Sequence, residues 1–365
     1  MTLDDLPTPC LVLDRGVLRG NIDRMAVHLA GKGVALRPHM KTAKSIDVAR
    51  LALAGQPGGI TVSTLAEAEY FAGHGIADIL YAVGITPQKL PQVAKLNFAG
   101  ARIAVITDDA ATASAIAARD DAPRVLIEID TGESRGGVAP DDPALLEIAG
   151  RLGPLLVGVM THAGHSYAGR STAAMATIAE TERAGVVGAA ERLRAAGYQV
   201  PIVSMGSSPT AVHGATFDGV TELRAGVYMF GDLFQAEIGT HAPEAIAVTV
   251  LASVIGRRPG QVLLDAGGIA LSKDRSTAEA PVDYGYGLVL DLDGRATLGR
   301  SVVTRAYQEH GVVRLDPTEP VELPIGARLR VAPNHTCMTA AAHDRYHVVD
   351  GDREVIAVWP RANGW

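Results

Sequence analysis

The feature that most constrains this chain is a repeated alternation of short apolar segments and alanine-rich segments along its first two-thirds. The apolar segments are rich in Val and Ile and are bounded by Gly, Pro, Asp or Thr, which is typical of strands buried on both faces of a parallel sheet. The strand candidates are residues 34–37, 60–63, 79–82, 103–106, 125–129, 156–160, 202–205 and 222–226. Between them, segments such as 65–72, 109–118 and 171–196 carry Ala, Leu and Glu at helical spacing.

Eight strand-then-helix units predict an α/β fold of the (β/α)8 TIM barrel type. A doubly wound open sheet is the alternative architecture. That alternative predicts a glycine-rich phosphate-binding fingerprint after the first strand, and the sequence has none there. We therefore expect the barrel.

The last third of the chain predicts a C-terminal all-β domain. Beyond about residue 240, Gly, Asp and Pro punctuate short apolar segments, and no long helical pattern intervenes. The strand candidates are residues 248–255, 262–265, 287–290, 301–306, 311–314, 328–331 and 346–349. Residues 10–13 form one more candidate, which we expect to pair with this domain. The expected division is a barrel over residues 14–238 and a β-domain made of 1–13 and 239–365.

Composition narrows the classes of function. The 33 Lys and Arg residues against 40 Asp and Glu give a formal net charge of -7, and aromatic residues are only 4%. We therefore expect no nucleic acid partner. Two cysteines cannot form a disulfide framework, which favours a reducing compartment. There is no apolar run of about 18 residues and no signal-peptide pattern, so we expect a cytoplasmic protein without a membrane partner.

The C-terminal ends of barrel strands are where enzymes of this fold place their chemistry, and reactive side chains fall there. Lys41 follows the first strand, and small residues at 206–210 and 226–228 follow the seventh and eighth. Most lysines are solvated surface charges, but burial and nearby cations lower the pKa of a barrel-mouth lysine and make it a Schiff-base nucleophile. Small residues let backbone N–H groups hold a phosphate. The combination predicts pyridoxal 5'-phosphate (PLP) as the cofactor.

Other polar residues near the mouth have two interpretations. His162, His165 and Tyr167 follow the sixth strand, where they either line a pocket or are ordinary loop residues. Arg135 follows the fifth strand and either lies near the cofactor or forms a structural ion pair with a neighbouring acidic residue. The spacing by itself leaves both alternatives open.

A second group of candidate ligands lies near the C-terminus, where one residue separates His335 from Cys337. On an extended segment this spacing places both side chains on one face, because the strand period is two. Imidazole and thiolate suit a borderline-soft ion such as Zn²⁺, and two protein ligands leave coordination positions open for water or substrate. The alternative is a buried cysteine beside a strand histidine.

Taken together, these motifs resemble the fold-type III PLP enzymes. Within them, the chain is similar to the group of D-serine dehydratase, D-threo-3-hydroxyaspartate dehydratase and D-threonine aldolase. The resemblance covers essentially the whole length and rests on the order and spacing of the motifs. They are 37–42 (RPHMKT), 60–69 (ITVSTLAEAE), 78–83 (DILYAV), 161–167 (THAGHSY), 203–210 (VSMGSSPT), 219–230 (GVTELRAGVYMF), 308–311 (QEHG) and 334–337 (NHTC).

The resemblance implies a role for each matching barrel residue. Lys41 resembles the lysine that binds PLP covalently, and His162 resembles the histidine beside the pyridine ring. Tyr167 is similar to an aromatic pocket residue of the dehydratases, and Arg224 to the arginine that faces the pyridine nitrogen. The residues that the resemblance places around the phosphate are Gly206, Ser207, Thr210, Gly226 and Tyr228.

The resemblance also implies a metal and a reaction. His335 and Cys337 resemble the metal ligands of the dehydratases, with Zn²⁺ or Mn²⁺ as the ion. The aldolases more often show His-x-Asp at this place, so Cys337 favours a dehydratase. The implied reaction is β-elimination of a D-3-hydroxy amino acid such as D-serine or D-threo-3-hydroxyaspartate, which gives a 2-oxo acid and ammonia.

Two alternative functions remain open, and the resemblance also implies an oligomeric state. An aldolase would cleave the same kind of substrate to glycine and an aldehyde. A non-catalytic PLP-binding protein is the alternative from another class, but such barrels typically lack the β-domain and the His-x-Cys pair. Members of fold type III pair head to tail, so the resemblance implies a homodimer.

Overall fold

The computed structural model describes residues 1–318 and 321–365. The chain forms two compact units, here called the barrel unit (Arg24–Gly226 with Ala362–Trp365) and the β unit (Met1–Asp23 with Val227–Arg361). Among the described residues, no helix combines the length and the apolar character that crossing a membrane requires.

The barrel unit contains eight parallel strands in the order β2-β9-β8-β7-β6-β5-β4-β3. A bridge between His39 and Thr61, with a 2.8 Å hydrogen bond from Met40 N to Thr61 O, connects the two ends of this order. The strands are β2 (Ala35–Pro38), β3 (Ile60–Val62), β4 (Asp78–Gly84), β5 (Arg102–Thr107), β6 (Arg124–Ile129), β7 (Leu156–Thr161), β8 (Ile202–Met205) and β9 (Glu222–Ala225). The prediction of a (β/α)8 barrel is therefore confirmed.

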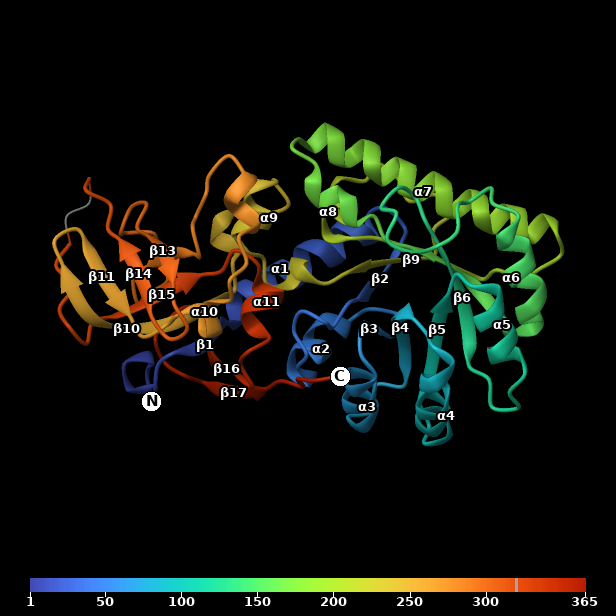
Figure 1. The fold of residues 1–365 in the computed structure, drawn as a ribbon, viewed down its shortest axis with the longest axis horizontal. Helices are drawn as coiled ribbons and strands as arrows, with labels where there is room; N and C mark the ends of the chain where they lie inside the picture. The colour runs from blue at the N-terminus through green and yellow to red at the C-terminus, as the bar shows by residue number, and fades with distance from the viewer. Residues whose placement is uncertain (319–320) are drawn as a thin grey trace. The chain divides into compact units, whose positions relative to one another are not determined.

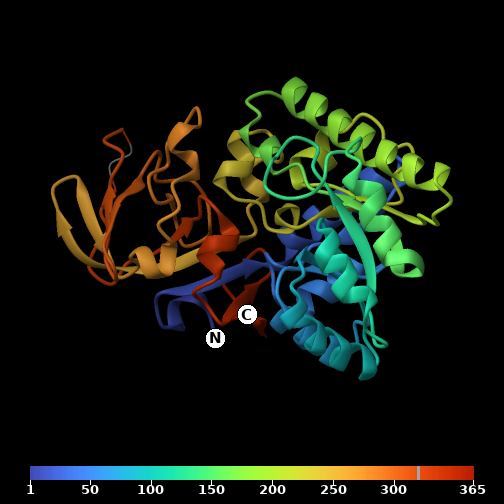
Figure 2. The same ribbon diagram turned by 45° about the vertical axis from the view of Figure 1, so that its right-hand side comes forward.

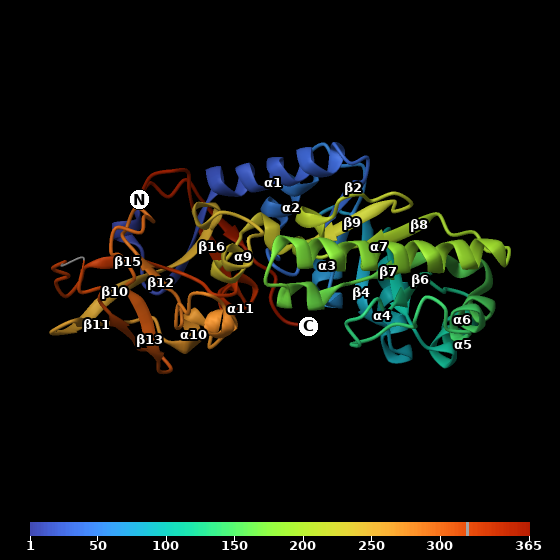
Figure 3. The same cartoon turned by 90° about the horizontal axis from the view of Figure 1, so that it is seen from above.

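Helices lie outside the ring of strands (Figure 1 and Figure 2). They are α1 (Arg15–Ala30), which begins in the β unit, then α2 (Ile46–Leu53), α3 (Leu65–Gly73), α4 (Leu90–Phe98), α5 (Ala110–Ala117), α6 (Ala144–Leu152), α7 (Thr172–Ala195) and α8 (Ser208–His213). Short 3-10 helices are η2 (Pro87–Lys89), η3 (Gly153–Leu155) and η4 (Gly164–Ala168). The long helix α7 lies over β7 and β8 (Figure 3).

The interior of the barrel is apolar on one side and charged on the other. Side chains alternate across a strand, and the strand register places Leu80, Ile106 and Leu126 on the same inward face, where they form a buried apolar cluster. The register also places Glu222 and Arg224 of β9 on the inward face. The interior therefore departs from the all-apolar layers that fill many barrels of this type.

The β unit is a nine-stranded, mainly antiparallel sheet in the order β11-β14-β13-β12-β15-β10-β1-β16-β17. Because β10 also pairs with β11, six of these strands close into a small ring. The strands are β1 (Cys10–Asp14), β10 (Val248–Arg258), β11 (Gln261–Leu264), β12 (Leu288–Leu290), β13 (Val302–Ala306), β14 (Gly311–Arg314), β15 (Arg328–Ala332), β16 (Arg345–Val349) and β17 (Ala357–Pro360). The predicted C-terminal β-domain is confirmed, and β1 pairs with β10 and β16 as expected for residues 10–13.

In the described part of the β unit, short helices interrupt this sheet. They are α9 (Leu233–Glu237), α10 (Gly268–Leu271) and α11 (Thr336–Ala340), with the 3-10 helices η1 (Leu3–Asp5), η5 (Val227–Met229), η6 (Pro243–Ala245) and η7 (Ser276–Glu279). The sequence analysis missed the edge strand β17, which has four residues and ends at Pro360, a residue with no backbone N–H for further pairing.

Candidate active site

The C-terminal ends of β2, β7 and β9 bring three of the predicted cofactor residues together. Lys41 lies three residues beyond β2, His162 directly follows β7, and Arg224 lies in β9. Burial, together with the positive charges of Lys41 and Arg224, lowers the pKa of His162 to about 3. Lys41 itself is exposed, so the burial that the sequence analysis expected for it is wrong. The reason is its position beyond the strand end, outside the packed interior of the barrel.

His162 is held as a neutral imidazole by its hydrogen bond. Its Nδ1 atom lies 2.8 Å from the carbonyl oxygen of Gly206. A carbonyl oxygen only accepts, so Nδ1 carries the proton and Nε2 retains its lone pair. Together with the lowered pKa, this gives a flat, uncharged ring beside two cations. Such a ring suits contact with the face of an aromatic cofactor.

Two glycines allow the loops after β8 and β9 to pack closely. Gly206 has a φ of 128°, and a Cβ atom at this position would lie 2.5 Å from the carbonyl oxygen of Arg224. A Cβ atom on Gly226 would lie 2.8 Å from the carbonyl oxygen of His39 and 3.1 Å from the Thr42 hydroxyl. Both positions therefore require glycine, and Gly226 brings the loop after β9 against the loop that carries Lys41.

A cluster of buried hydroxyl groups marks the start of α8. The Ser207 hydroxyl accepts a hydrogen bond from Thr210 N at 3.3 Å and lies 3.1 Å from the Thr210 hydroxyl. It also lies 2.9 Å from the hydroxyl of Ser166, in η4. Hydroxyl and backbone N–H groups at such a turn are the usual donors to phosphate. Sequence reasoning did not single out Ser166, because only the fold brings η4 against α8.

Arg224 is the end of a chain of polar contacts that crosses the barrel interior. Its guanidinium donates to the Ser204 hydroxyl at 2.6 Å, and that hydroxyl donates to Glu222 at 2.7 Å. The other carboxylate oxygen of Glu222 accepts from Arg37 at 2.7 Å, and Arg37 also pairs with Asp78 at 3.0 Å. A hydroxyl that gives its proton to a carboxylate can only accept from Arg224. The chain of contacts therefore fixes the guanidinium as a cation at the barrel mouth.

Replacing Glu222 with alanine is expected to lower the free energy of unfolding by about 3–5 kcal/mol, because Arg37 and Ser204 lose their common buried partner. The measurement is urea denaturation of the cofactor-free protein. The matched control is Glu180→Ala on α7, where an exposed carboxylate pairs with Arg183 and is expected to contribute less than about 1 kcal/mol. Equal effects of the two substitutions would contradict the buried-network interpretation.

The remaining predicted barrel residues lie in two places. Tyr167 is half-buried in η4, near the mouth, while Tyr228 is buried in η5 and belongs to the β unit. Burial raises the pKa of Tyr228. Arg135 forms an ion pair with Glu133 at 3.4 Å, as the structural alternative expected, and its side chain is 56% exposed. The assignment of the two tyrosines to the cofactor site remains a prediction.

The donor set at the barrel mouth fits PLP. The exposed amine of Lys41 suits the aldehyde of PLP, and the neutral imidazole of His162 suits its ring. The guanidinium of Arg224 suits the ring nitrogen, and the hydroxyl groups of the turn at Ser207 suit the phosphate. In addition, the Nδ1 atom of His165 is buried in the same loop as His162 and makes no hydrogen bond within the described part of the chain. A buried ring nitrogen without a protein partner is expected where a ligand completes the site.

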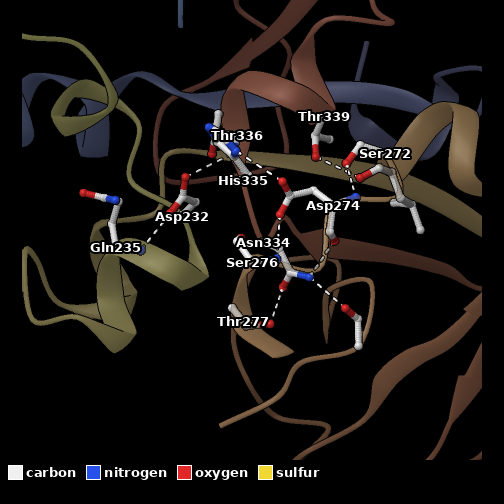
Figure 4. Close-up of polar contacts among 12 residues, drawn as sticks. Asp232, Gln235, Ser272, Asp274, Ser276, Thr277, Asn334, His335, Thr336 and Thr339 are labelled. Atoms are coloured by element: carbon white, nitrogen blue, oxygen red, sulfur yellow. Dashed lines mark hydrogen bonds and ion pairs between the residues drawn. The ribbon is translucent and has the colours of Figure 1, made fainter. Parts of the chain in front are cut away.

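The predicted metal ligands lie in the β unit, at the start of α11. Figure 4 shows His335 beside Asp274. The prediction that His335 and Cys337 share an extended segment is wrong, because His335 is the extended N-cap residue and Cys337 is already helical. The helix starts here because Asp232 accepts the Thr336 N–H at 3.1 Å and the Gly231 carbonyl accepts the Thr336 hydroxyl at 2.6 Å. The two side chains still meet, because His335 forms a hydrogen bond with Cys337.

Acidic residues surround this pair and were missed by sequence reasoning. Asp274 Oδ2 lies 3.4 Å from His335 Nδ1, and its Oδ1 accepts the Ser276 N–H at 2.8 Å. Burial opposes protonation of His335, but the hydrogen bonds to Asp274 and Cys337 outweigh it and raise its pKa to about 11. Burial raises the pKa of Asp232 to about 6. No spacing signal links residues 232 and 274 to 335, because only the folded sheet brings them together.

The donor set of this pair fits a metal held by few protein ligands. Imidazole and thiolate suit Zn²⁺ and related ions, and a carboxylate on Nδ1 is the usual outer partner of a metal-binding histidine. Within residues 1–318 and 321–365, no group of three His, Cys, Asp or Glu side chains has an arrangement that could hold a metal ion. His343 contacts the Ala270 carbonyl through Nε2 at 3.0 Å and is not part of the pair. An ion at His335 and Cys337 would keep open positions, as catalysis requires.

Comparison with known proteins connects both units to one family. The chain matches "Alanine racemase, N-terminal domain" over residues 13–233 and "Putative serine dehydratase domain" over residues 247–349. It is 47% identical to the D-threo-3-hydroxyaspartate dehydratase of Delftia sp. (strain HT23), covering 100% of this chain and 99% of that protein. It is 30% identical to a D-serine dehydratase of Dictyostelium discoideum, covering 100% and 98% of the two chains.

The chain is also similar to an aldolase and to a solved structure of a dehydratase variant. The chain is 30% identical to a 3-hydroxy-D-aspartate aldolase of Paracoccus denitrificans (strain Pd 1222), covering 99% and 92% of the two chains. A solved structure of a cysteine-to-alanine variant of D-threo-3-hydroxyaspartate dehydratase in the metal-free form has a TM-score of 0.95 and 45% identity, with 100% of both chains covered. The chain therefore belongs to the fold-type III family of PLP enzymes, in the branch of lyases that comprises D-3-hydroxy amino acid dehydratases and aldolases.

Proposed function

We propose that this protein is a PLP- and metal-dependent dehydratase that converts a D-3-hydroxy amino acid to a 2-oxo acid and ammonia. D-threo-3-Hydroxyaspartate is the first candidate substrate and D-serine the second. The observation that carries the proposal is the 47% identity, over the full length, to a protein named for the first of these substrates. The thiol of Cys337 beside His335 supports the dehydratase assignment, because the resemblance places His-x-Asp there in aldolases.

Nine residues would hold the cofactor. Lys41 would bind it covalently, His162 would lie against the ring, and Arg224 would face the ring nitrogen. The residues proposed for the phosphate are Gly206, Ser207, Thr210, Gly226 and Tyr228, with Tyr167 at the edge of the pocket. When bound, PLP supplies an electron sink for the electron pair left at Cα after a proton is removed. The proposed barrel domain over residues 14–238 includes all of these positions.

The chain's own residues would move the protons of the reaction. Lys41 has an exposed amine, which in its neutral form is a base for the Cα proton. Arg224 cannot give up a proton readily, because its guanidinium stays charged and donates to Ser204 and to the Thr161 carbonyl at 2.5 Å. We infer that Arg224 orients the ring rather than protonating it.

In the proposed β-domain, residues 1–13 and 239–365, the pair of His335 and Cys337 would hold Zn²⁺ or Mn²⁺. Asp274 would keep the proton of His335 on Nδ1, so that Nε2 can bind the ion. When bound, the metal supplies Lewis acidity that helps the substrate hydroxyl to leave. The metal-free structure of a cysteine variant of a similar dehydratase supports a role for a cysteine in metal binding.

We also propose a homodimer in the cytoplasm. The resemblance to fold-type III enzymes supports the dimer, and a reducing compartment agrees with the state of Cys10 and Cys337, neither of which forms a disulfide. Besides PLP and the metal ion, the proposal requires a D-amino acid as the small-molecule partner.

Aldol cleavage is the second candidate function, because the chain is also 30% identical to a 3-hydroxy-D-aspartate aldolase. The two reactions give different products from one substrate. The decisive experiment incubates the holoenzyme with D-threo-3-hydroxyaspartate, D-serine and D-threonine, each with Zn²⁺ or Mn²⁺. A dehydratase releases ammonia and a 2-oxo acid in equal amounts. Glycine and an aldehyde as the main products would overturn the dehydratase proposal in favour of the aldolase.

A further inference from the structure

A carboxyl group is buried in helix α7 at a position where an apolar residue is expected. The buried face of α7 follows helical spacing through Met175, Ala179, Glu182, Val186 and Leu193. Glu182 stands in the middle of this face with 0% of its surface exposed. Burying a carboxyl group is costly unless protein groups replace its lost water. The partners of Glu182 therefore indicate what the group does.

One oxygen of Glu182 connects two loops of the barrel mouth. Its Oε1 atom accepts the N–H of Ala163 at 2.9 Å and the N–H of Gly206 at 3.0 Å. Ala163 directly follows His162, and Gly206 directly precedes Ser207. Burial raises the pKa of Glu182, while the Thr210 hydroxyl and these two N–H groups favour its ionised form. The carboxyl group thus interacts with both halves of the candidate cofactor site.

Hydrogen bonds hold the backbone of Gly206 at both its N–H and its carbonyl group. Its N–H donates to Glu182, and its carbonyl accepts from His162 Nδ1 at 2.8 Å. Its positive φ and its close approach to the Arg224 backbone leave it little freedom to adjust. Displacement of the Gly206 N–H would therefore shift the carbonyl that fixes the proton on His162. It would also shift Ser207, which begins α8.

We propose that Glu182 is a positioning residue of the cofactor site, which holds the His162 loop and the turn at 206–210 in a fixed relation. This inference rests on the proposed function, because it assumes that these two parts bind the ring and the phosphate of PLP. Glu182 would act through the N–H groups of Ala163 and Gly206, from which it accepts hydrogen bonds. The essential property is its acceptor oxygen, which a glutamine side chain also offers.

The test compares Glu182→Ala with Glu182→Gln and with the control Glu180→Ala, which removes an exposed carboxylate two residues away on the same helix. Each protein is freed of cofactor and titrated with PLP, with absorbance and visible circular dichroism as readouts. Loss of two hydrogen bonds is expected to raise the Kd for PLP about 10- to 100-fold in Glu182→Ala. The dichroism per bound PLP should also change, because the ring is no longer fixed. Glu182→Gln and Glu180→Ala should remain within about threefold of the wild-type Kd.

The outcomes separate this inference from the proposed function. A wild-type protein that does not bind PLP refutes the proposed function itself. If the wild type binds PLP and Glu182→Ala has the same Kd and dichroism, only the positioning role is overturned. A defect in Glu182→Gln as large as that in Glu182→Ala also overturns it, because the acceptor oxygen is then insufficient. If Glu182→Ala does not fold, Glu182→Met fills the volume without an acceptor and is judged by the same criteria.

Discussion

Replacement of Lys41 with alanine is expected to abolish the visible absorbance of bound PLP and to reduce turnover by at least about 10⁴-fold, because one residue would supply both the covalent attachment and the base. Absorbance spectroscopy after dialysis and an ammonia-release assay measure the two effects. The fold is expected to remain intact, since the side chain is exposed at the barrel mouth and contributes little packing. Far-ultraviolet circular dichroism and thermal denaturation check this expectation.

The matched control for this prediction is Lys95→Ala. Lys95 is an exposed lysine on α4, and its loss should leave the absorbance and turnover unchanged. Retention of the wild-type spectrum and rate in Lys41→Ala would refute the cofactor assignment. Loss of activity together with loss of folding would instead contradict the statement that Lys41 is dispensable for stability.

Replacement of Cys337 with serine is expected to weaken metal binding and to lower the elimination rate by more than about 100-fold, because an anionic soft ligand becomes a neutral one. Metal content after gel filtration and product release measure the two effects. The absorbance of bound PLP should persist, because Lys41 belongs to the barrel unit and Cys337 to the β unit. Cys10→Ser is the control, since it changes the other cysteine, which lies in β1.

A second substitution at the same position tests the nature of the ligand. Cys337→Asp restores a negative charge but offers hard oxygen atoms, which suit Mn²⁺ better than Zn²⁺. Partial recovery of activity is therefore expected with Mn²⁺ and less with Zn²⁺. If Cys337→Ser keeps the normal metal content and rate, Cys337 is a structural cysteine and the dehydratase assignment loses its main support from the site.

The order of elements and most strand positions could be predicted from the sequence, because they depend on local periodicity and on breakers. All sixteen candidate strands, from residues 10–13 to residues 346–349, overlap observed strands for this reason. The expected pairing of residues 10–13 followed from their place outside the barrel repeat. The edge strand β17 was not predicted, because four residues that end in proline are too few to show an alternation of apolar and polar side chains.

Residue spacing gave the wrong backbone conformation where a contact with a distant residue determines it. The spacing of His335 and Cys337 favoured a strand, but Asp232, about 100 residues earlier, accepts the Thr336 N–H and starts a helix between them. The sequence analysis correctly expected the side chains of His335 and Cys337 to lie together, but it expected a strand where the structure has the start of a helix. In the same way, the burial of Lys41 was inferred from its place in the sequence, and its exposure depends on how the surrounding loops pack.

The sequence by itself determined the fold class, the family and the reactive side chains, because hydrophobic period, turn residues and motif order are properties of contiguous segments. Only the tertiary structure decided which groups support those side chains. Glu182 is the one acidic residue on the buried face of α7, and its partners lie on loops 19 and 24 residues away. Asp274 reaches His335 over 61 residues. Such contacts arise from strand order and loop packing, so no local pattern in the sequence encodes them.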